Sequence, residues 1–193
     1  MPETIEIFGA IRTGDAAKVG ELLRAEPALA SARNERGDSA LLAAAYLGRR
    51  DIMDSLIAAG AEPTLWEAVT IGLKERVVEI LRREPSLIGE YSHDGWTALH
   101  LAAFFGHRDL AAFLIERGAD VNARSKSETF AQANTPLHAA AANKQTEVAR
   151  LLVERGADVN ARDGSGFTPL ALAANSRADL LMLMLLENGA RAD

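Results

Sequence analysis

Four histidines are the candidate acid–base or metal-binding residues of this 193-residue chain, which contains no cysteine. Only His93 is followed by an acidic residue, Asp94. Adjacent residues on a turn make a poor catalytic dyad, and no third group is placed to orient them. The chain also lacks a glycine-rich phosphate loop and HExxH spacing. We therefore expect no enzyme activity, no bound metal and no cofactor.

Charge and hydropathy argue against two classes of partner. The net charge is −6 and the pI is near 5.3, so the positive field that dominates nucleic-acid affinity is absent overall. No apolar run approaches the roughly 20 residues of a membrane helix, and the N-terminus lacks the basic start of a secretory signal. We expect no nucleic acid, no membrane insertion and a cytoplasmic protein.

The elements that position these residues form repeats. Thr97–Arg124 returns as Thr135–Arg162 and, in weaker form, as Thr168–Arg191. A second correspondence, at an offset of 58 residues, relates the first two units to the next two. The equivalent starting positions of the six units are Ile5, Ser39, Pro63, Thr97, Thr135 and Thr168.

Each unit predicts two helices joined by a turn. In the fourth unit, Thr97 can cap a helix that runs through an apolar and alanine-rich segment to Gly106. A second helix follows, with one broad apolar face, and Gly118 ends it. One such pair cannot bury its apolar face alone, so neighbouring units must stack.

The strings T-A-L-H-L-A-A, T-P-L-H-A-A and G-A-D-V-N-A resemble ankyrin repeats over essentially the whole chain. The E-P-x-L segments at 26–29 and 84–87 resemble a bacterial-type subgroup of this family. The resemblance implies an all-α solenoid in a single domain, residues 1–193, with short β-hairpin fingers between units. It also implies that His100 and His138 are buried and hydrogen-bonded between neighbouring units.

Two intervals depart from the repeat. Only 24 residues separate Ser39 from Pro63, so a finger is missing at 60–64, either as a partner-shaped notch or as a tolerated deletion. The interval from Thr97 to Thr135 is 38 residues, which predicts an insertion in the finger at 125–134. Phe130 in this insertion either contacts a partner or packs back against the phenylalanines at 104 and 105.

Aromatic residues cluster in the fourth unit, on positions that face the concave groove in ankyrin repeats. Large rigid aromatic side chains are preferred binding anchors, although the phenylalanines could instead pack under neighbouring fingers. We predict a protein–protein interaction module (adaptor, scaffold or inhibitor) that binds an unidentified partner protein through its concave surface. The expected partner-binding residues are Tyr46, Tyr91, His93, Asp94, Trp96, Phe104, Phe105, Arg124, Phe130 and Asn143.

The last helix contains an unbroken apolar run, Leu180–Leu186, where a terminal repeat normally needs a polar outer face. This run supports an alternative function, a structural protein that forms a homodimer through its C-terminal repeat. The run is also expected if a partner docks there, if a longer chain continues beyond Asp193, or if the helix rotates and buries most of it. The residues expected in a dimer contact are Leu180, Met182, Leu183 and Met184.

Overall fold

The computed structural model describes residues 2–127 and 132–192, and these residues form an all-α structure. Twelve α-helices follow one another as six pairs within the described residues. The pairs are α1 (Pro2–Thr13) with α2 (Ala16–Ala25), α3 (Ala40–Tyr46) with α4 (Arg50–Ala58), α5 (Leu65–Thr70) with α6 (Lys74–Arg83), α7 (Ala98–Phe105) with α8 (Arg108–Glu116), α9 (Pro136–Ala142) with α10 (Thr146–Glu154), and α11 (Pro169–Ser176) with α12 (Asp179–Glu187). The predicted all-α repeat architecture is confirmed.

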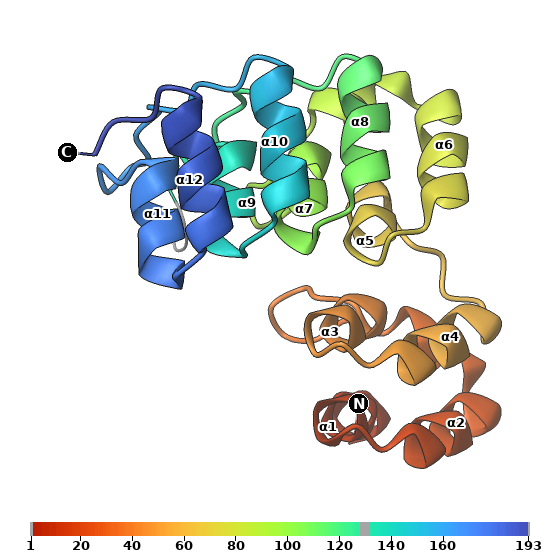
Figure 1. The fold of residues 1–193 in the computed structure, drawn as a ribbon. Coiled ribbons are helices and arrows are strands. Elements are labelled where there is room, and N and C mark those ends of the chain that lie inside the picture. Colours follow the sequence, from red (N-terminus) through yellow and green to blue (C-terminus); the bar gives the residue numbers. More distant parts are fainter. Residues whose placement is uncertain (1, 128–131, 193) are drawn as a thin grey trace. The chain divides into compact units, whose positions relative to one another are not determined.

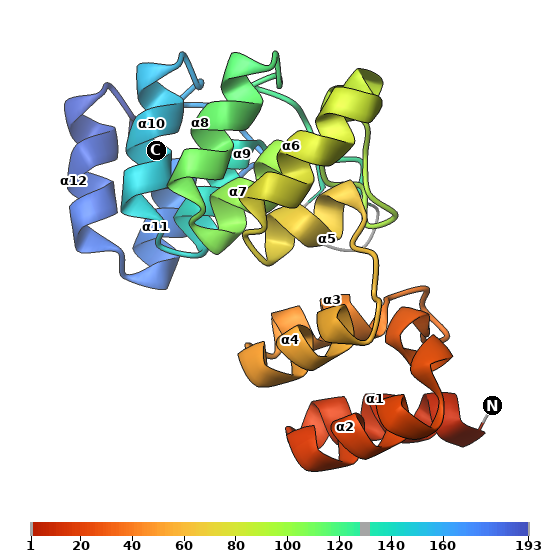
Figure 2. The ribbon, with the colours of Figure 1, turned by 90° about the vertical axis from the view of Figure 1, so that its right-hand side faces the viewer.

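The chain divides into two compact units, Met1–Glu67 and Ala68–Asp193. In the first, α1 packs against α2 and α3, and α2 packs against α4. In the second, α7, α9 and α11 lie side by side in one row, and α8, α10 and α12 form a second row (Figures 1 and 2). A single domain over residues 1–193 stays a prediction.

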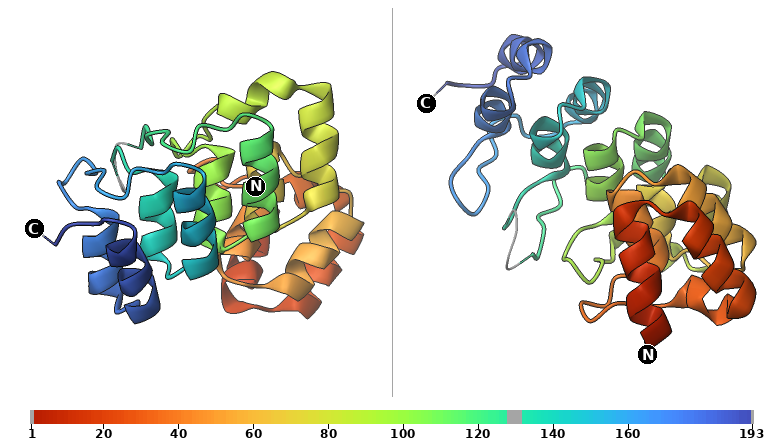
Figure 3. Two further views of the ribbon diagram at one scale, coloured as in Figure 1. Left: turned by 45° about the horizontal axis from the view of Figure 1, so that its top comes forward. Right: turned by 90° about the horizontal axis from the view of Figure 1, so that it is seen from below.

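Turns replace most of the expected β-hairpin fingers. The described residues contain two isolated antiparallel bridges, Arg33 with Ser39 and Tyr91 with Thr97. They contain no strand that extends beyond a single bridge. Side-chain bonds close the first turn, because Asn34 Oδ1 accepts from the backbone N–H groups of Arg36 and Asp38. Since helix α3 then starts directly after Ser39, there is no room for a longer strand. In the second unit, the segments joining the helix pairs lie on one side of them (Figure 3).

The turns inside three of the helix pairs are approached closely by a side chain of the next repeat. Gly106 ends α7 with φ 78°, and a Cβ built on it would lie 2.3 Å from Oε1 of Gln145, in the following repeat. Glycine therefore serves both the left-handed backbone and the close approach. The same arrangement recurs with Arg49 over Gly14 and with His107 over Gly72.

The long connection between α8 and α9 is tied to the turns on either side of it. The Lys126 N–H donates to the Gly95 carbonyl at 2.8 Å, and the Gly164 N–H donates to the Gln132 carbonyl at 2.7 Å. Phe130 lies outside the described residues, so its predicted role stays a prediction.

Candidate protein-binding surface

His100 and His138 link consecutive repeats, as predicted. His100 lies in the first turn of α7 and His138 in the first turn of α9, and both are fully buried. His100 Nδ1 accepts from Thr97 at the start of its own helix, and Nε2 lies 3.0 Å from the Asn134 carbonyl of the next repeat. His138 repeats the arrangement, with Nε2 3.0 Å from the Phe167 carbonyl. Because a carbonyl can only accept, Nε2 is the protonated nitrogen in both rings.

Both imidazoles are held in the neutral form. Burial lowers the pKa of His100 to about 4, although the hydrogen bond to the Asn134 carbonyl acts in the opposite direction. Burial also lowers the pKa of His138. A neutral, buried ring with both nitrogens engaged is suited to holding repeats together, and neither ring has access to a substrate.

His93 and Asp94 make an exposed polar contact at a turn, with Nε2 and Oδ1 3.0 Å apart. The two side chains come from adjacent residues, as the sequence indicated. An exposed contact of this kind contributes little to stability.

The side chains along one edge of α7 form a continuous set of ring contacts, here called the α7 aromatic row. The ring centroids of Trp96 and Phe104 are 5.5 Å apart, and those of Phe104 and Phe105 are 5.2 Å apart. Each pair is arranged edge to face. The ring of Phe105 stacks on His107 at 6.3 Å. Trp96 also lies 5.9 Å from His100, so the row joins the buried core at one end. The row is Trp96, His100, Phe104, Phe105 and His107.

The prediction that Trp96 is an exposed anchor is wrong. Only 8% of its surface is accessible, whereas Phe104 and Phe105 are half-buried. The indole is covered because it contacts the rings of His100 and Phe104, both on the helix that begins just after it. Trp96 is therefore a buried residue that packs against the ring of Phe104.

Asn143 and Arg124 join neighbouring repeats while remaining exposed. The Asn143 amide donates to the Phe104 carbonyl at 2.7 Å and satisfies a carbonyl in the last turn of α7. The Arg124 guanidinium donates to the carbonyls of Ala133, at 3.1 Å, and Arg162, at 2.8 Å. These bonds hold the edge of the surface in one geometry, and whether either residue also contacts a partner stays a prediction.

Two predicted aromatic residues lie outside the α7 aromatic row. Tyr91 is half-buried beside the turn, with Lys126 Nζ 4.0 Å from its ring centroid, a cation–π distance. Tyr46, at the end of α3 in the first unit, is 51% exposed, and the adjacent Leu47 is 47% exposed. Sequence comparison at the 58-residue offset relates Tyr46 to Phe104, so equivalent positions of two repeats carry large rings.

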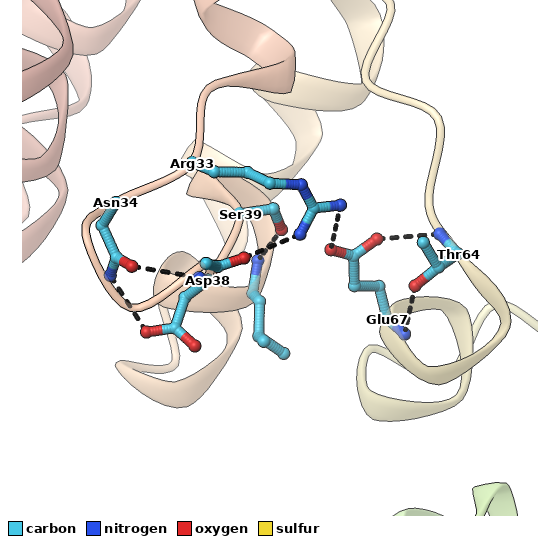
Figure 4. A network of polar contacts seen from close by, with 8 residues as sticks. Arg33, Asn34, Asp38, Ser39, Thr64 and Glu67 are labelled. Carbon is cyan, nitrogen blue, oxygen red and sulfur yellow. Dashed lines mark hydrogen bonds and ion pairs between the residues drawn. The ribbon is translucent and has the colours of Figure 1, made fainter. Parts of the chain in front are cut away.

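Glu67 is a buried acidic residue that the sequence reasoning missed. Its carboxylate accepts from the Thr64 N–H at 2.8 Å and lies 3.9 Å from Arg33 Nη2 (Figure 4). Thr64 and Glu67 form a reciprocal cap at the start of α5, and the T-x-x-E spacing was the signal for it. Glu67 is thereby a structural residue that ties the start of α5 to the turn before α3.

The apolar run in α12 is divided by the helix into two faces. Leu180, Leu183 and Leu186 are exposed, Met182 is intermediate, and Met184 is 2% exposed. The prediction of an uncovered Met184 is wrong, because that position faces the interior of the helix pair. The exposure of the leucines agrees with the expectation of an apolar outer face.

Comparison with known families decides what these linked repeats are. The family model described as "Ankyrin repeats (3 copies)" matches residues 7–125 and 124–193. The chain belongs to the ankyrin-repeat family. Membership accounts for the histidine links and the paired helices, and it marks the chain as a protein–protein interaction module whose family is typically non-enzymatic.

Curated relatives share only a part of the chain. A segment of 56 residues is 43% identical to "NAD-capped RNA hydrolase NUDT12" from Homo sapiens, covering 29% of this chain and 12% of that protein. A segment of 66 residues is 36% identical to "Ankyrin repeat-containing protein P1E11.10" from Schizosaccharomyces pombe, covering 33% of this chain and 30% of that protein. Since the match spans so little of the hydrolase, its named activity is not transferred to this chain.

Among the described residues, no helix has the length and apolar character needed to cross a membrane.

Proposed function

We propose that the chain binds a partner protein through the exposed end of the α7 aromatic row and the turns beside it. Phe104 and Phe105 are the anchors, because they combine large apolar rings with partial exposure. This half-buried pair, packed against buried Trp96, is the observation that carries the proposal.

The surroundings of the anchors suit a protein partner. Tyr91 adds a third half-buried ring, and the flanking groups carry both signs of charge: Asp94 beside His93, and the cationic Lys126 and Arg124. An apolar centre with a mixed polar rim is typical of specific protein interfaces.

The surface is held in place before any partner arrives. Asn143 fixes the carbonyl of Phe104, and the ring of Phe105 stacks on His107, whose Nε2 lies 3.0 Å from the Thr70 carbonyl. A surface that is already ordered loses little conformational entropy on association, so a modest contact area gives useful affinity. Binding is the proposed action of the chain, and catalysis is not part of it.

Affinity capture from the source cell, with cross-linking to map the contact, tests the proposal. The double variant Phe104→Ala/Phe105→Ala should retain the partner about tenfold less well or worse, because two anchors are removed. Phe113→Ala is the matched control: its ring is also half-buried, but it lies on α8 with Arg117 4.7 Å over it. The control should bind as the wild type does.

Trp96→Ala separates support from contact. Truncating a buried tryptophan should cost about 3–5 kcal/mol of stability, and its binding defect should follow that loss. A Phe104/Phe105 double variant that is fully folded and binds normally would place the interface elsewhere. Cross-links confined to α8, α10 and α12 would do the same.

A further inference from the structure

The end of the second unit carries an apolar surface that the proposed function does not use. Three leucines of α12 are exposed: Leu180 by 76%, Leu183 by 55% and Leu186 by 46%. Phe167, in the turn before α11, is 46% exposed. Contiguous exposed apolar side chains of this size mark an interaction site more often than isolated ones do. We call these four residues and the hollow beside them the C-terminal face.

The hollow has a volume of about 420 Å³ and lies between α11 and α12. Small and apolar side chains of both helices form its floor, and Arg162 and Arg191 contribute to its lining. No acidic residue is among the described residues that line it. The C-terminal face therefore combines an apolar ridge, the α12 leucines, with an adjacent apolar hollow whose charged residues, among those described, are both cationic.

This face is not built to receive a further repeat in the way that the preceding repeats receive theirs. Ala171 stands at the position of His138, the residue whose ring binds the next repeat. Met182 stands at the position of Ala149, which is fully buried in α10, the helix on which α12 packs. Both changes remove features that join repeats five and six, so another occupant fits the face better.

We propose that the C-terminal face binds a second copy of the same chain about a two-fold axis. In this dimer, α12 of each copy inserts its leucines into the hollow of the other. A ridge and a hollow on one surface are self-complementary, which is what a two-fold contact requires.

Charge complementarity supports a second copy as the occupant. The apolar segment of α12 is bounded by acidic residues, Asp179 at its start and Glu187 at its end, and both are exposed. The hollow that would receive this helix carries Arg162 and Arg191. The acidic ends of one copy thus meet the cationic edge of the other, and the two-fold axis repeats the contact.

The first test is the molar mass in solution, measured by sedimentation or light scattering over the micromolar range. The wild type should shift from monomer to dimer as the concentration rises. Leu183→Glu and Leu180→Glu should remain monomeric with unchanged circular dichroism, since both side chains are already exposed. Leu47→Glu is the matched control: Leu47 is 47% exposed but belongs to the first unit, and the variant should still dimerise.

A charge-inversion pair tests which surfaces meet. Arg191→Glu makes the charges of the face more acidic, and Asp179→Lys/Glu187→Lys makes them basic. Each variant alone should dimerise at least tenfold more weakly than the wild type. Mixed in equal amounts, they should form a heterodimer, because the acidic helix of the first variant then faces the cationic hollow of the second, and the basic helix of the second faces a hollow in which one arginine has become acidic.

Several results would overturn the proposal. A wild type that stays monomeric throughout the range would do so, as would a dimer that survives Leu183→Glu and is lost in Leu47→Glu. If the wild type is monomeric and Leu183→Glu releases a captured partner, the face belongs to that partner. None of these outcomes affects the binding proposed for Phe104 and Phe105, which lie on α7.

Discussion

At the scale of single residues, the same imidazole that could have suggested catalysis explains part of the stability of the chain. His100 is buried as a neutral ring between two repeats, and its Nε2 proton goes to the Asn134 carbonyl. Protonation would place a second N–H on Nδ1, which now accepts from Thr97. The charged form therefore loses a hydrogen bond as well as its solvation.

Stability should fall as the pH falls from 7 to 5. The pKa of His100 is 6.5 in the unfolded chain and about 4 in the folded one, so the unfolded state binds more protons in this window. His100 lowers the free energy of unfolding by about 2 kcal/mol at pH 5, and this loss grows until the pH falls below the pKa of the folded state. Urea unfolding at several pH values measures it.

Two variants isolate this contribution. His100→Ala should lose roughly 1–3 kcal/mol at pH 7 and show a shallower pH dependence, because the buried titrating group is gone. Phe113→Ala, which removes a half-buried ring and no titrating group, should keep the wild-type slope. Parallel pH profiles for wild type and His100→Ala would contradict the assignment.

At the scale of helices, the turns inside the helix pairs share a left-handed backbone conformation, which is unfavourable for two of the residues that adopt it. The turn between paired helices takes a positive φ in all six pairs. Glycine occupies this position in the first four, whereas Lys144 (φ 58°) and Arg177 (φ 56°) occupy it in the last two. A residue with a Cβ is strained in this conformation by about 1 kcal/mol or more.

Lys144→Gly and Arg177→Gly should each raise the free energy of unfolding by about 0.5–1 kcal/mol, since glycine relieves the strain and costs some entropy. Arg150→Gly is the matched control, because it makes a similar change in the middle of α10 at an exposed position. That variant should lose about 1 kcal/mol. Urea unfolding of the three variants measures whether each free energy of unfolding rises or falls. A lower free energy of unfolding in Lys144→Gly would show that the lysine side chain stabilises the turn.

Sequence reasoning predicted the helices well and the side-chain environments less well. Thr97 and His100 recur as Thr135 and His138, so their cap and their link to the next repeat followed from the repeat itself. Strands were predicted from the family resemblance, but local turn bonds close the connections after a single bridge.

Burial could not be deduced residue by residue where the repeat is not kept. Trp96 is buried because its ring packs along α7, and Met184 because it faces the interior of its helix pair. The Arg33–Glu67 ion pair joins residues 34 positions apart in the least regular part of the pattern. No local spacing indicates such a contact.

At the scale of the whole molecule, each repeat is tied chiefly to its neighbour. Asn122 donates to the Gly156 carbonyl and accepts from the Asp158 N–H of the following repeat. Asn160 makes the same two bonds one repeat later, to Gly189 and Arg191. Stability is then close to a sum of repeat and nearest-neighbour contributions.

Ile11→Ala should loosen the first unit selectively. Ile11 is fully buried in α1, and its truncation should cost about 2–5 kcal/mol. In hydrogen exchange, amides of α1 to α4 should exchange faster, while those of α9 and α10 should keep their wild-type protection. Uniform acceleration across all helices would show instead that the chain opens as one cooperative body.

The residues that lie over the turn glycines bear on how this chain can be copied. Arg49 covers Gly14 and His107 covers Gly72, and both members of the second pair stand 58 positions after those of the first. A gene segment encoding two consecutive repeats therefore carries a glycine together with the side chain that fills the space above it. Duplicating that segment transmits a finished interface, whereas duplicating one repeat would set a glycine against a side chain selected for another neighbour. The smallest segment of the N-terminal part of the chain that can be duplicated with its interface intact is thus two repeats. A longer array should therefore be designed by inserting repeats in pairs.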